Sequence, residues 1–164
     1  MMQFQIDTAD SSNVTDSQIS DLLKSAFVES GFTTSDRAAV LFAPSAVRGR
    51  GHLMCARPQE IDKLAGMVIV VTPDSSARRL ASSDEVEMHL LAVDNEYRGL
   101  GLGRALVGAA IDVAQELGFR KMILWTQPAM TAAQKLYESA GFVRTAHRDP
   151  IINGLKFLVY ETHW

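Results

Sequence analysis

The feature that most constrains the fold is a strand, a glycine-rich turn and a helix in succession, followed by a second strand. An apolar strand is expected at 85–93, a helix at 102–117 where apolar residues recur with helical spacing, and another apolar strand at 121–126. Two strands joined by a helical crossover lie parallel in one sheet. The chain is therefore predicted to be an α/β protein with at least one parallel strand pair.

Hydrophobic periodicity and breaker residues place the other elements. They are strands at 3–7, 52–57 and 64–71, a polar loop from Thr8 to Asp16, a helix from Asp16 ended by Gly31, helices at 35–41 and 131–140, and terminal strands at 142–148 and 155–163 turned by Asn153-Gly154. Pro44, Gly49 and Gly51 are expected to end the helix at 35–41, and the polar residues 72–84 to form a mobile loop. With 164 residues, the whole chain is expected to form a single domain.

Composition and charge argue against several classes of function. The formal net charge of -3 gives no basic footprint for nucleic acid. The single cysteine, Cys55, rules out an internal disulfide or a multi-cysteine metal site, and His52, His147 and His163 lack metal-ligand spacing. No signal peptide or membrane-spanning apolar run is recognisable. We therefore expect a cytoplasmic protein with no metal and with no nucleic-acid or membrane partner.

The turn between the strand and the helix has the composition of an anion-binding site. Gly99, Gly101 and Gly103 carry no side chain that would cover the backbone amides, and the helix that begins there adds the positive end of its dipole. Arg98 and Arg104 can add positive charge at the rim. The sequence predicts that a pyrophosphate group binds here.

Two other phosphate-binding motifs fit this turn less well. A P-loop needs a Lys and then a hydroxyl residue after its last glycine, and this chain has Arg104-Ala105 there. A dinucleotide fingerprint needs an acidic residue about 20 positions further on, at the end of the next strand. Here that strand ends in Thr126 and Gln127. The first interpretation fails and the second is weakened.

Two segments resemble the GNAT superfamily of N-acetyltransferases. LLAVDNEYRGLGLGRAL, residues 90–106, is similar to the family's acyl-CoA-binding motif, with Arg98, Gly101 and Gly103 at its defining positions. AAQKLYESAGF, residues 132–142, is similar to the second family motif, a helix with a Leu-Tyr pair that ends in Gly-Phe. Together with the order of elements, the resemblance covers roughly residues 50–164.

The resemblance implies a fold, a co-substrate and an activity. The fold is a mixed, strongly bent sheet flanked by helices on both faces, with a splayed central strand pair. The activity is transfer of an acetyl group from acetyl-CoA to a primary amine of a small molecule or peptide, with the Leu91 amide polarising the thioester carbonyl. The residues implied to bind acetyl-CoA are Leu91, Ala92, Val93, Arg98, Gly99, Leu100, Gly101, Leu102, Gly103, Arg104, Ala105 and Tyr137.

The same resemblance assigns catalytic roles. Tyr137 matches the family tyrosine that protonates the CoA thiolate. Glu87 matches a position where some members carry a catalytic base, and His89 is a second candidate because imidazole titrates near neutral pH. Strand alternation is expected to place Glu87, His89 and Leu91 on one face. Alternatively, Glu87 has no catalytic role and is only a solvated or salt-bridged residue of the strand.

One position departs from the family pattern, and rival functions stay open. The second motif often has an Asn seven residues before the tyrosine, where it contacts the CoA arm, and Met130 stands there in this chain. A noncatalytic acyl-CoA-binding or sensing module would keep the glycine turn without turnover. A nucleotide-binding protein would use the turn for another phosphate. The resemblance is compatible with a homodimer, and it does not specify the acceptor amine.

Overall fold

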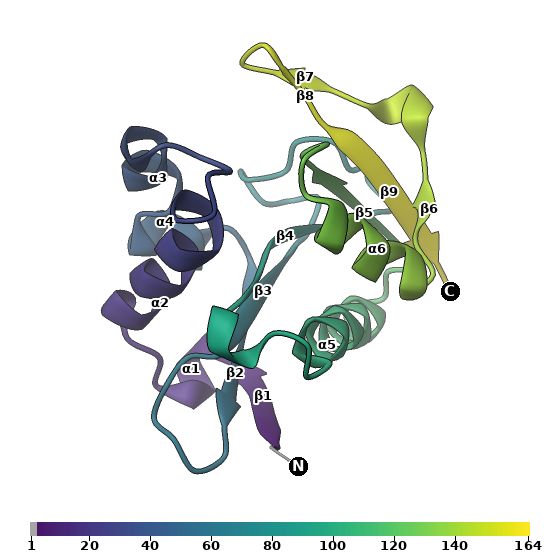
Figure 1. Ribbon diagram of the computed structural model, residues 1–164. Coiled ribbons are helices and arrows are strands. Elements are labelled where there is room, and N and C mark those ends of the chain that lie inside the picture. The colour runs from purple at the N-terminus through teal and green to yellow at the C-terminus, as the bar shows by residue number, and fades with distance from the viewer. Residues whose placement is uncertain (1–2) are drawn as a thin grey trace.

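A seven-stranded mixed sheet forms the centre of the computed structural model, which describes residues 3–164 (Figure 1). The strands are β1 (Phe4–Thr8), β2 (His52–Pro58), β3 (Gly66–Val71), β4 (Val86–Val93), β5 (Lys121–Thr126), β6 (Val143–Arg144), β7 (Ile151–Ile152), β8 (Leu155–Lys156) and β9 (Leu158–His163). The sheet order is β1-β2-β3-β4-β5-β9-β6, and β7 and β8 form a separate hairpin. β4 and β5 pair in parallel, as the crossover predicts, and the other sheet neighbours are antiparallel.

Helices cover both faces of this sheet. They are α1 (Ala9–Ser12), α2 (Asp16–Leu23) with its π-helical continuation η1 (Lys24–Val28), α3 (Ser35–Leu41), α4 (Pro44–Gly49), the 3-10 turn η2 (Asn95–Tyr97), α5 (Leu102–Glu116), α6 (Thr131–Ser139) and the 3-10 turn η3 (Ala146–Arg148). Figure 1 shows α2, α3 and α4 grouped on one side of the strands and α5 on the other. Within residues 3–164, no helix has the length and apolar character needed to cross a membrane.

Most of the core lies in two apolar clusters on opposite faces of the sheet, and a third, smaller cluster joins Ala81, Ile123 and Val159. One joins Val68 of β3 and Met122 of β5 to Leu106 of α5. The other joins Ile69 of β3 to Leu22 of α2. Because successive strand residues point to opposite faces, β3, which is buried at every position, contributes to both clusters. The predicted mixed sheet with helices on both faces is therefore confirmed.

Local sequence chemistry explains where α2 begins. Thr15 and Gln18 form a capping box, in which the Gln18 amide donates to Thr15 Oγ1 at 3.1 Å and the Thr15 amide donates to Gln18 Oε1 at 2.9 Å. The helix then buries Ile19, Leu22 and Leu23. Burial of each such side chain stabilises the fold by about 1.5–3 kcal/mol. This apolar stripe holds α2 on the sheet.

β4 and β5 separate soon after they pair. Among the described residues, the parallel ladder consists of Val86 with Met122 and Glu87 with Ile123. Beyond this point, residues 88–93 have no strand partner on the β5 side. This is the splayed central pair that the resemblance implies, and it leaves backbone groups of β4 facing an opening in the sheet.

Two expectations for the N-terminal half are wrong. Residues 9–12, expected in a loop, form α1, where Thr8 Oγ1 accepts from the Ser11 amide at 3.2 Å. Pro44, expected to end the preceding helix, begins α4 instead. Proline suits the first helical position because its missing amide has no intrahelical partner there in any case.

The C-terminal strands are also arranged differently from the expectation. The strand expected at 142–148 is limited to β6, and Asn153-Gly154 closes the separate β7–β8 hairpin. Pro150 cannot donate to a ladder, and the Asp149 carboxylate accepts from the Val159 amide at 2.9 Å. β9 thus lies between β5 and β6 rather than forming a long hairpin with the preceding segment.

Candidate active site

The glycine turn and the first turn of α5 present a row of backbone amides. Gly99 and Gly101 have φ values of 75° and 81°, in the left-handed region that glycine tolerates, and Gly101 is the N-cap of α5. Leu102, Gly103 and Arg104 are the first residues of α5, so their amides have no intrahelical acceptor. No side chain of residues 3–164 caps the helix either. A Cβ at Gly101 would meet no atom within 4 Å. With no capping side chain among residues 3–164 and no side chain at Gly101, these amides are available to bind a pyrophosphate.

Contacts to α6 and β4 fix the same turn from behind. A Cβ at Gly103 would lie 3.0 Å from Leu136 Cδ2, so glycine allows α5 to pack closely against α6. Arg104 Nη2 donates to the Ser139 carbonyl at 3.0 Å, and Arg98 Nε donates to the Val93 carbonyl at 3.4 Å. Both arginines lie at the turn, and each is engaged with backbone while its side chain stays exposed.

β4 contains a bulge beside the opening. Leu90 has a φ of 49°, a conformation that costs a non-glycine residue about 1–2 kcal/mol. The register with β3 shifts between Met67 and Ile69, which pair with Ala92 and His89. β4 therefore carries one extra residue, as in a β-bulge. Strained backbone of this kind clusters at functional sites.

The bulge changes which side chains share a face. Leu90 packs with the cluster on the α2 side, and Leu91 packs with the cluster on the α5 side. Glu87 and His89 lie on the α2 side, whereas Val86 belongs to the α5-side cluster. The expectation that Leu91 shares the face of Glu87 and His89 is therefore wrong, because the extra residue resets the alternation.

Glu87 is fully buried and accepts hydrogen bonds from a neighbouring loop. Its Oε2 accepts from the amides of Arg79, Leu80 and Ala81 at 2.9, 2.6 and 2.7 Å. Burial pushes the pKa of Glu87 up, but the hydrogen bonds from His89 and these amides outweigh it, and the net pKa is lowered. Residues 72–84 are thus anchored, in contrast to the expected mobile loop.

His89 joins Glu87 to an arginine from a distant helix end. His89 Nε2 lies 2.8 Å from Glu87 Oε1, and Nδ1 lies 3.3 Å from Arg50 Nη1. Because arginine can only donate, Nδ1 accepts and the imidazole proton is on Nε2. Burial lowers the pKa of His89, Glu87 opposes this, and the charges of Arg50 and Arg79 add to the lowering. The net lowered pKa keeps the imidazole neutral near pH 7.

Tyr137 lies on the other face, on α6. Its ring packs against Phe142 and Tyr160, with centroids 5.9 and 6.2 Å away. Burial raises the pKa of the phenol, so it holds its proton at neutral pH. The predicted catalytic residues therefore fall into two groups. Glu87 and His89 lie on the α2 side of the splayed strands, and Tyr137 lies on the α5 side with the glycine turn.

Sequence reasoning missed two features of this site. Arg50 precedes β2 by a single glycine and lies 39 positions before His89, and no motif indicates that the two side chains meet. The bulge at Leu90 also has no glycine or asparagine to mark it. The one available signal is the consecutive pair Leu90-Leu91, which interrupts the alternation of polar and apolar residues in 85–90.

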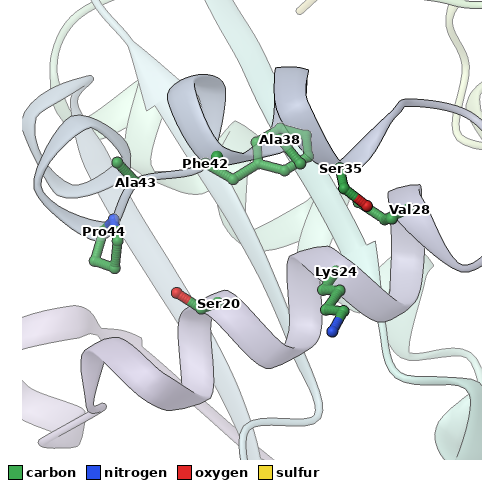
Figure 2. A pocket seen from close by; sticks show the side chains of 9 residues that line it. Ser20, Lys24, Val28, Ser35, Ala38, Phe42, Ala43 and Pro44 are labelled. Carbon is green, nitrogen blue, oxygen red and sulfur yellow. The ribbon is translucent and has the colours of Figure 1, made fainter.

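A separate pocket of about 410 Å³ lies among the N-terminal helices, away from β4. Figure 2 shows Ser20 and Lys24 of α2 and η1 on one side, with Ala38 and Phe42 on the other. None of the residues expected to bind acetyl-CoA or to act in catalysis lines this pocket. Among residues 3–164, no cluster of three or more His, Cys, Asp or Glu side chains could hold a metal ion.

Comparison with known proteins places this chain in a family. The family described as "Acetyltransferase (GNAT) family" matches residues 17–142. Mycothiol acetyltransferase from Cellulomonas flavigena is 36% identical over 97 residues, which cover 58% of this chain and 27% of that protein. The matched region is thus well under two thirds of the relative's own length. The chain belongs to the acetyltransferase (GNAT) family.

Solved structures agree on the fold. A GNAT-family acetyltransferase from Desulfovibrio desulfuricans superposes with a TM-score of 0.73 at 19% identity, covering 99% of each chain. A Bacillus subtilis acetyltransferase in complex with CoA superposes with a TM-score of 0.66 at 20% identity, covering 100% of this chain and 99% of that one. At such identities the similarity shows the fold alone.

Proposed function

We propose that this protein transfers an acetyl group from acetyl-CoA to a primary amine. The observation that carries the proposal is the break between β4 and β5, which opens beside a strained bulge and next to the uncapped start of α5. Family membership and a neighbour crystallised with CoA support it. A closed sheet or a capped helix would leave no place for a nucleotide-bearing thioester.

The donor is assigned to the α5 side. The amides of residues 99–105 bind its pyrophosphate, helped by Arg98 and Arg104. The β4 residues Leu91, Ala92 and Val93 offer backbone groups to the pantetheine arm, as an added strand would. The Leu91 amide, just after the bulge, is assigned to the thioester carbonyl, whose oxygen gains negative charge during attack.

The amine is assigned to the α2 side, where the base stands. An ammonium group must lose a proton before it can attack. Glu87 has its oxygens occupied by three amides and His89, so we assign it the role of orienting the imidazole. His89 Nδ1, whose hydrogen-bond contact within residues 3–164 is the 3.3 Å contact to Arg50, is assigned to accept the proton, and this contact breaks when it does so. The pair thus shares the task of the base.

Tyr137 is assigned as the acid that protonates the departing thiolate. Its hydroxyl makes no hydrogen bond to another side chain of residues 3–164, whereas that of Tyr160 donates to Glu138 Oε1 at 3.2 Å. The raised pKa of Tyr137 keeps the proton in place until the thiolate forms. This assignment separates the base and the acid onto the two faces of the sheet opening.

The experiment follows thiol release from acetyl-CoA in the presence of a panel of primary amines. The wild-type protein should release CoA only when a suitable amine is present. Tyr137→Phe should lower kcat by about a hundredfold, a typical contribution of general acid catalysis. It should leave the melting temperature and the CoA-induced increase in that temperature nearly unchanged, because the ring and its packing are kept.

Tyr160→Phe is the matched control, since it also removes one phenolic hydroxyl from the same aromatic group. Its kcat should stay within about threefold of wild type. If CoA and acetyl-CoA fail to stabilise the folded protein, the acetyltransferase proposal is wrong. If they stabilise it but no amine releases thiol, the protein is a noncatalytic acyl-CoA-binding module instead.

A further inference from the structure

Arg50 brings an unneutralised positive charge to the acceptor side of β4. The residue ends α4, and its Nη2 donates to the Leu41 carbonyl at 2.8 Å while Nη1 meets His89 Nδ1 at 3.3 Å. No carboxylate oxygen of residues 3–164 lies within the 4.0 Å of an ion pair from its guanidinium. A half-buried arginine without an acidic partner is costly unless an anion joins it.

The backbone holds this arginine in place. Ser75 Oγ donates to the Arg50 carbonyl at 2.7 Å. The next residue, Gly51, passes so close to β3 that a Cβ there would lie 2.2 Å from the Val70 carbonyl oxygen. The backbone at Arg50 is thus held by two tight contacts, and its side chain is positioned by the Leu41 carbonyl and His89.

The guanidinium keeps donors to spare. Arginine has five N–H donors in a planar fork, and the contacts to Leu41 and His89 engage two of them. Such a fork suits a carboxylate or a phosphate, which it can bind through two parallel hydrogen bonds. The donors that point away from these two contacts are therefore suited to an anion next to the imidazole.

The neighbouring charges favour an anion as well. Arg79 is exposed on the anchored loop, near enough that its charge adds to the effect of burial in lowering the pKa of Arg50. Glu87, the carboxylate that His89 links to Arg50, has its oxygens occupied by the amides of residues 79–81 and by His89. Its charge is turned away from Arg50, because the imidazole lies between them.

We propose that the acceptor amine carries an anionic group, a carboxylate or a phosphate, which binds Arg50 while the amine lies at His89. This inference rests on the proposed acetyl transfer and names the class of its acceptor. The donor's phosphates are assigned to the start of α5 on the other face, so the two anionic sites do not compete. Amines without an anionic group would leave Arg50 unpaired and bind weakly.

The test compares amines that differ in one anionic group. Each of several amino acids is paired with its carboxamide, and phosphoethanolamine is paired with ethanolamine. For the best substrate, kcat/KM should be at least about tenfold higher for the anionic member, as expected for a charge-assisted hydrogen bond. The carboxylate and phosphate pairs show which anion the site prefers.

Variants assign the effect to the guanidinium. Arg50→Gln should raise KM for the anionic amine about tenfold or more and change it less than about threefold for the neutral partner. Arg50→Lys should recover part of the loss, because it keeps the charge without the fork. Arg57→Gln is the control, since Arg57 lies near the opposite end of β2 and forms an ion pair with Asp62 at 3.9 Å.

The outcomes separate the two proposals. Wild type and Arg50→Gln should both be stabilised by CoA, which shows that the donor site is intact. If CoA binds and neutral amines are acetylated as well as their anionic partners, the anionic-acceptor inference is overturned while acetyl transfer stands. It is equally overturned if CoA binds but no member of any pair reacts, or if Arg50→Gln slows both members equally.

Discussion

Glu87 is a charged residue that the fold satisfies mainly with backbone amides. Three consecutive amides of a loop converge on one carboxylate oxygen, and the imidazole of His89 meets the other. A buried carboxylate is stable only when such bonds replace its hydration. The same contacts hold the loop and orient the candidate base, so a single side chain serves both stability and the site.

We predict that Glu87→Gln lowers the free energy of unfolding by about 2–3 kcal/mol at pH 7, the range for hydrogen bonds to charged groups. The amide group of glutamine has one acceptor oxygen and two N–H donors, so one donor must face either a loop amide or the imidazole. Urea denaturation measures the change. Glu60→Gln, at an exposed loop position, is the control and should change stability by under about 0.5 kcal/mol.

The pH dependence of this difference follows from the lowered pKa of Glu87. A carboxylate with a lowered folded-state pKa contributes its full stabilisation above its unfolded-state pKa, and loses it as the pH falls through the folded-state value. The gap between wild type and Glu87→Gln should therefore be widest above about pH 5 and shrink in acid. A gap that stays constant down to about pH 3 would contradict this account.

At the scale of elements, the start of α5 depends on the backbone freedom of Gly101. Its φ of 81° is strained for any residue with a Cβ, although no neighbouring atom would clash. The cost of a substitution there is thus conformational and not steric. The same freedom leaves the first amides of the helix uncovered, so stability and the proposed donor binding are linked at this one residue.

We predict that Gly101→Ala lowers the free energy of unfolding by about 1–2 kcal/mol and weakens CoA binding at least about tenfold. The binding loss follows because relief of the strain would rotate the amides away from the pyrophosphate. Chemical denaturation and calorimetric titration with CoA measure the two effects.

Gly108→Ala provides a control of opposite sign within the same helix. Gly108 is exposed and lies in the helix interior, and a Cβ there would meet no atom within 4 Å. Alanine should therefore add about 0.5–1 kcal/mol of stability. CoA affinity should not change. If both substitutions acted alike, the strain at Gly101 would not be the cause.

At the scale of the whole molecule, Arg148 joins three segments that are distant in sequence. Its guanidinium contacts Glu85, just before β4, and Glu161 of β9, each at 2.9 Å, and donates to the Leu80 carbonyl at 2.9 Å. Burial raises the pKa of Glu85, but hydrogen bonds from Arg148 and Ser82 overcome this and lower it overall. The C-terminal part of the chain thus supports the loop that Glu87 anchors.

We predict that Arg148→Met lowers the free energy of unfolding by about 2–3 kcal/mol at pH 7, since it leaves the buried Glu85 without its partner. The loss should shrink as the pH falls through the lowered pKa of Glu85, where the carboxyl becomes neutral. Thermal and urea denaturation at pH 7 and pH 4 measure it. Arg120→Met, at an exposed position, should change stability by under about 0.5 kcal/mol at both pH values.

The hydrophobic pattern correctly predicted helices and strands in which the same periodicity continues along the whole element. α3 and β5 have the predicted bounds, and α5 ends within one residue of the expected position. The wrong predictions lie at residues that fit two different structural roles. Pro44 can end one helix or begin the next, and Asn153-Gly154 can close either a long hairpin or a short one. Pairing with segments distant in the sequence decides which role each residue takes. The pattern of residues within one segment carries no information about that pairing.

Local sequence was enough to predict the crossover unit, the glycine turn and the second motif with Tyr137, because each depends on neighbours within a few residues. The contact of Arg50 with His89, the amides that saturate Glu87 and the bulge at Leu90 follow from tertiary packing instead. These arise where residues 6 to 39 positions apart in the sequence meet in the folded chain. Such contacts depend on how whole elements pack, and no local period records them.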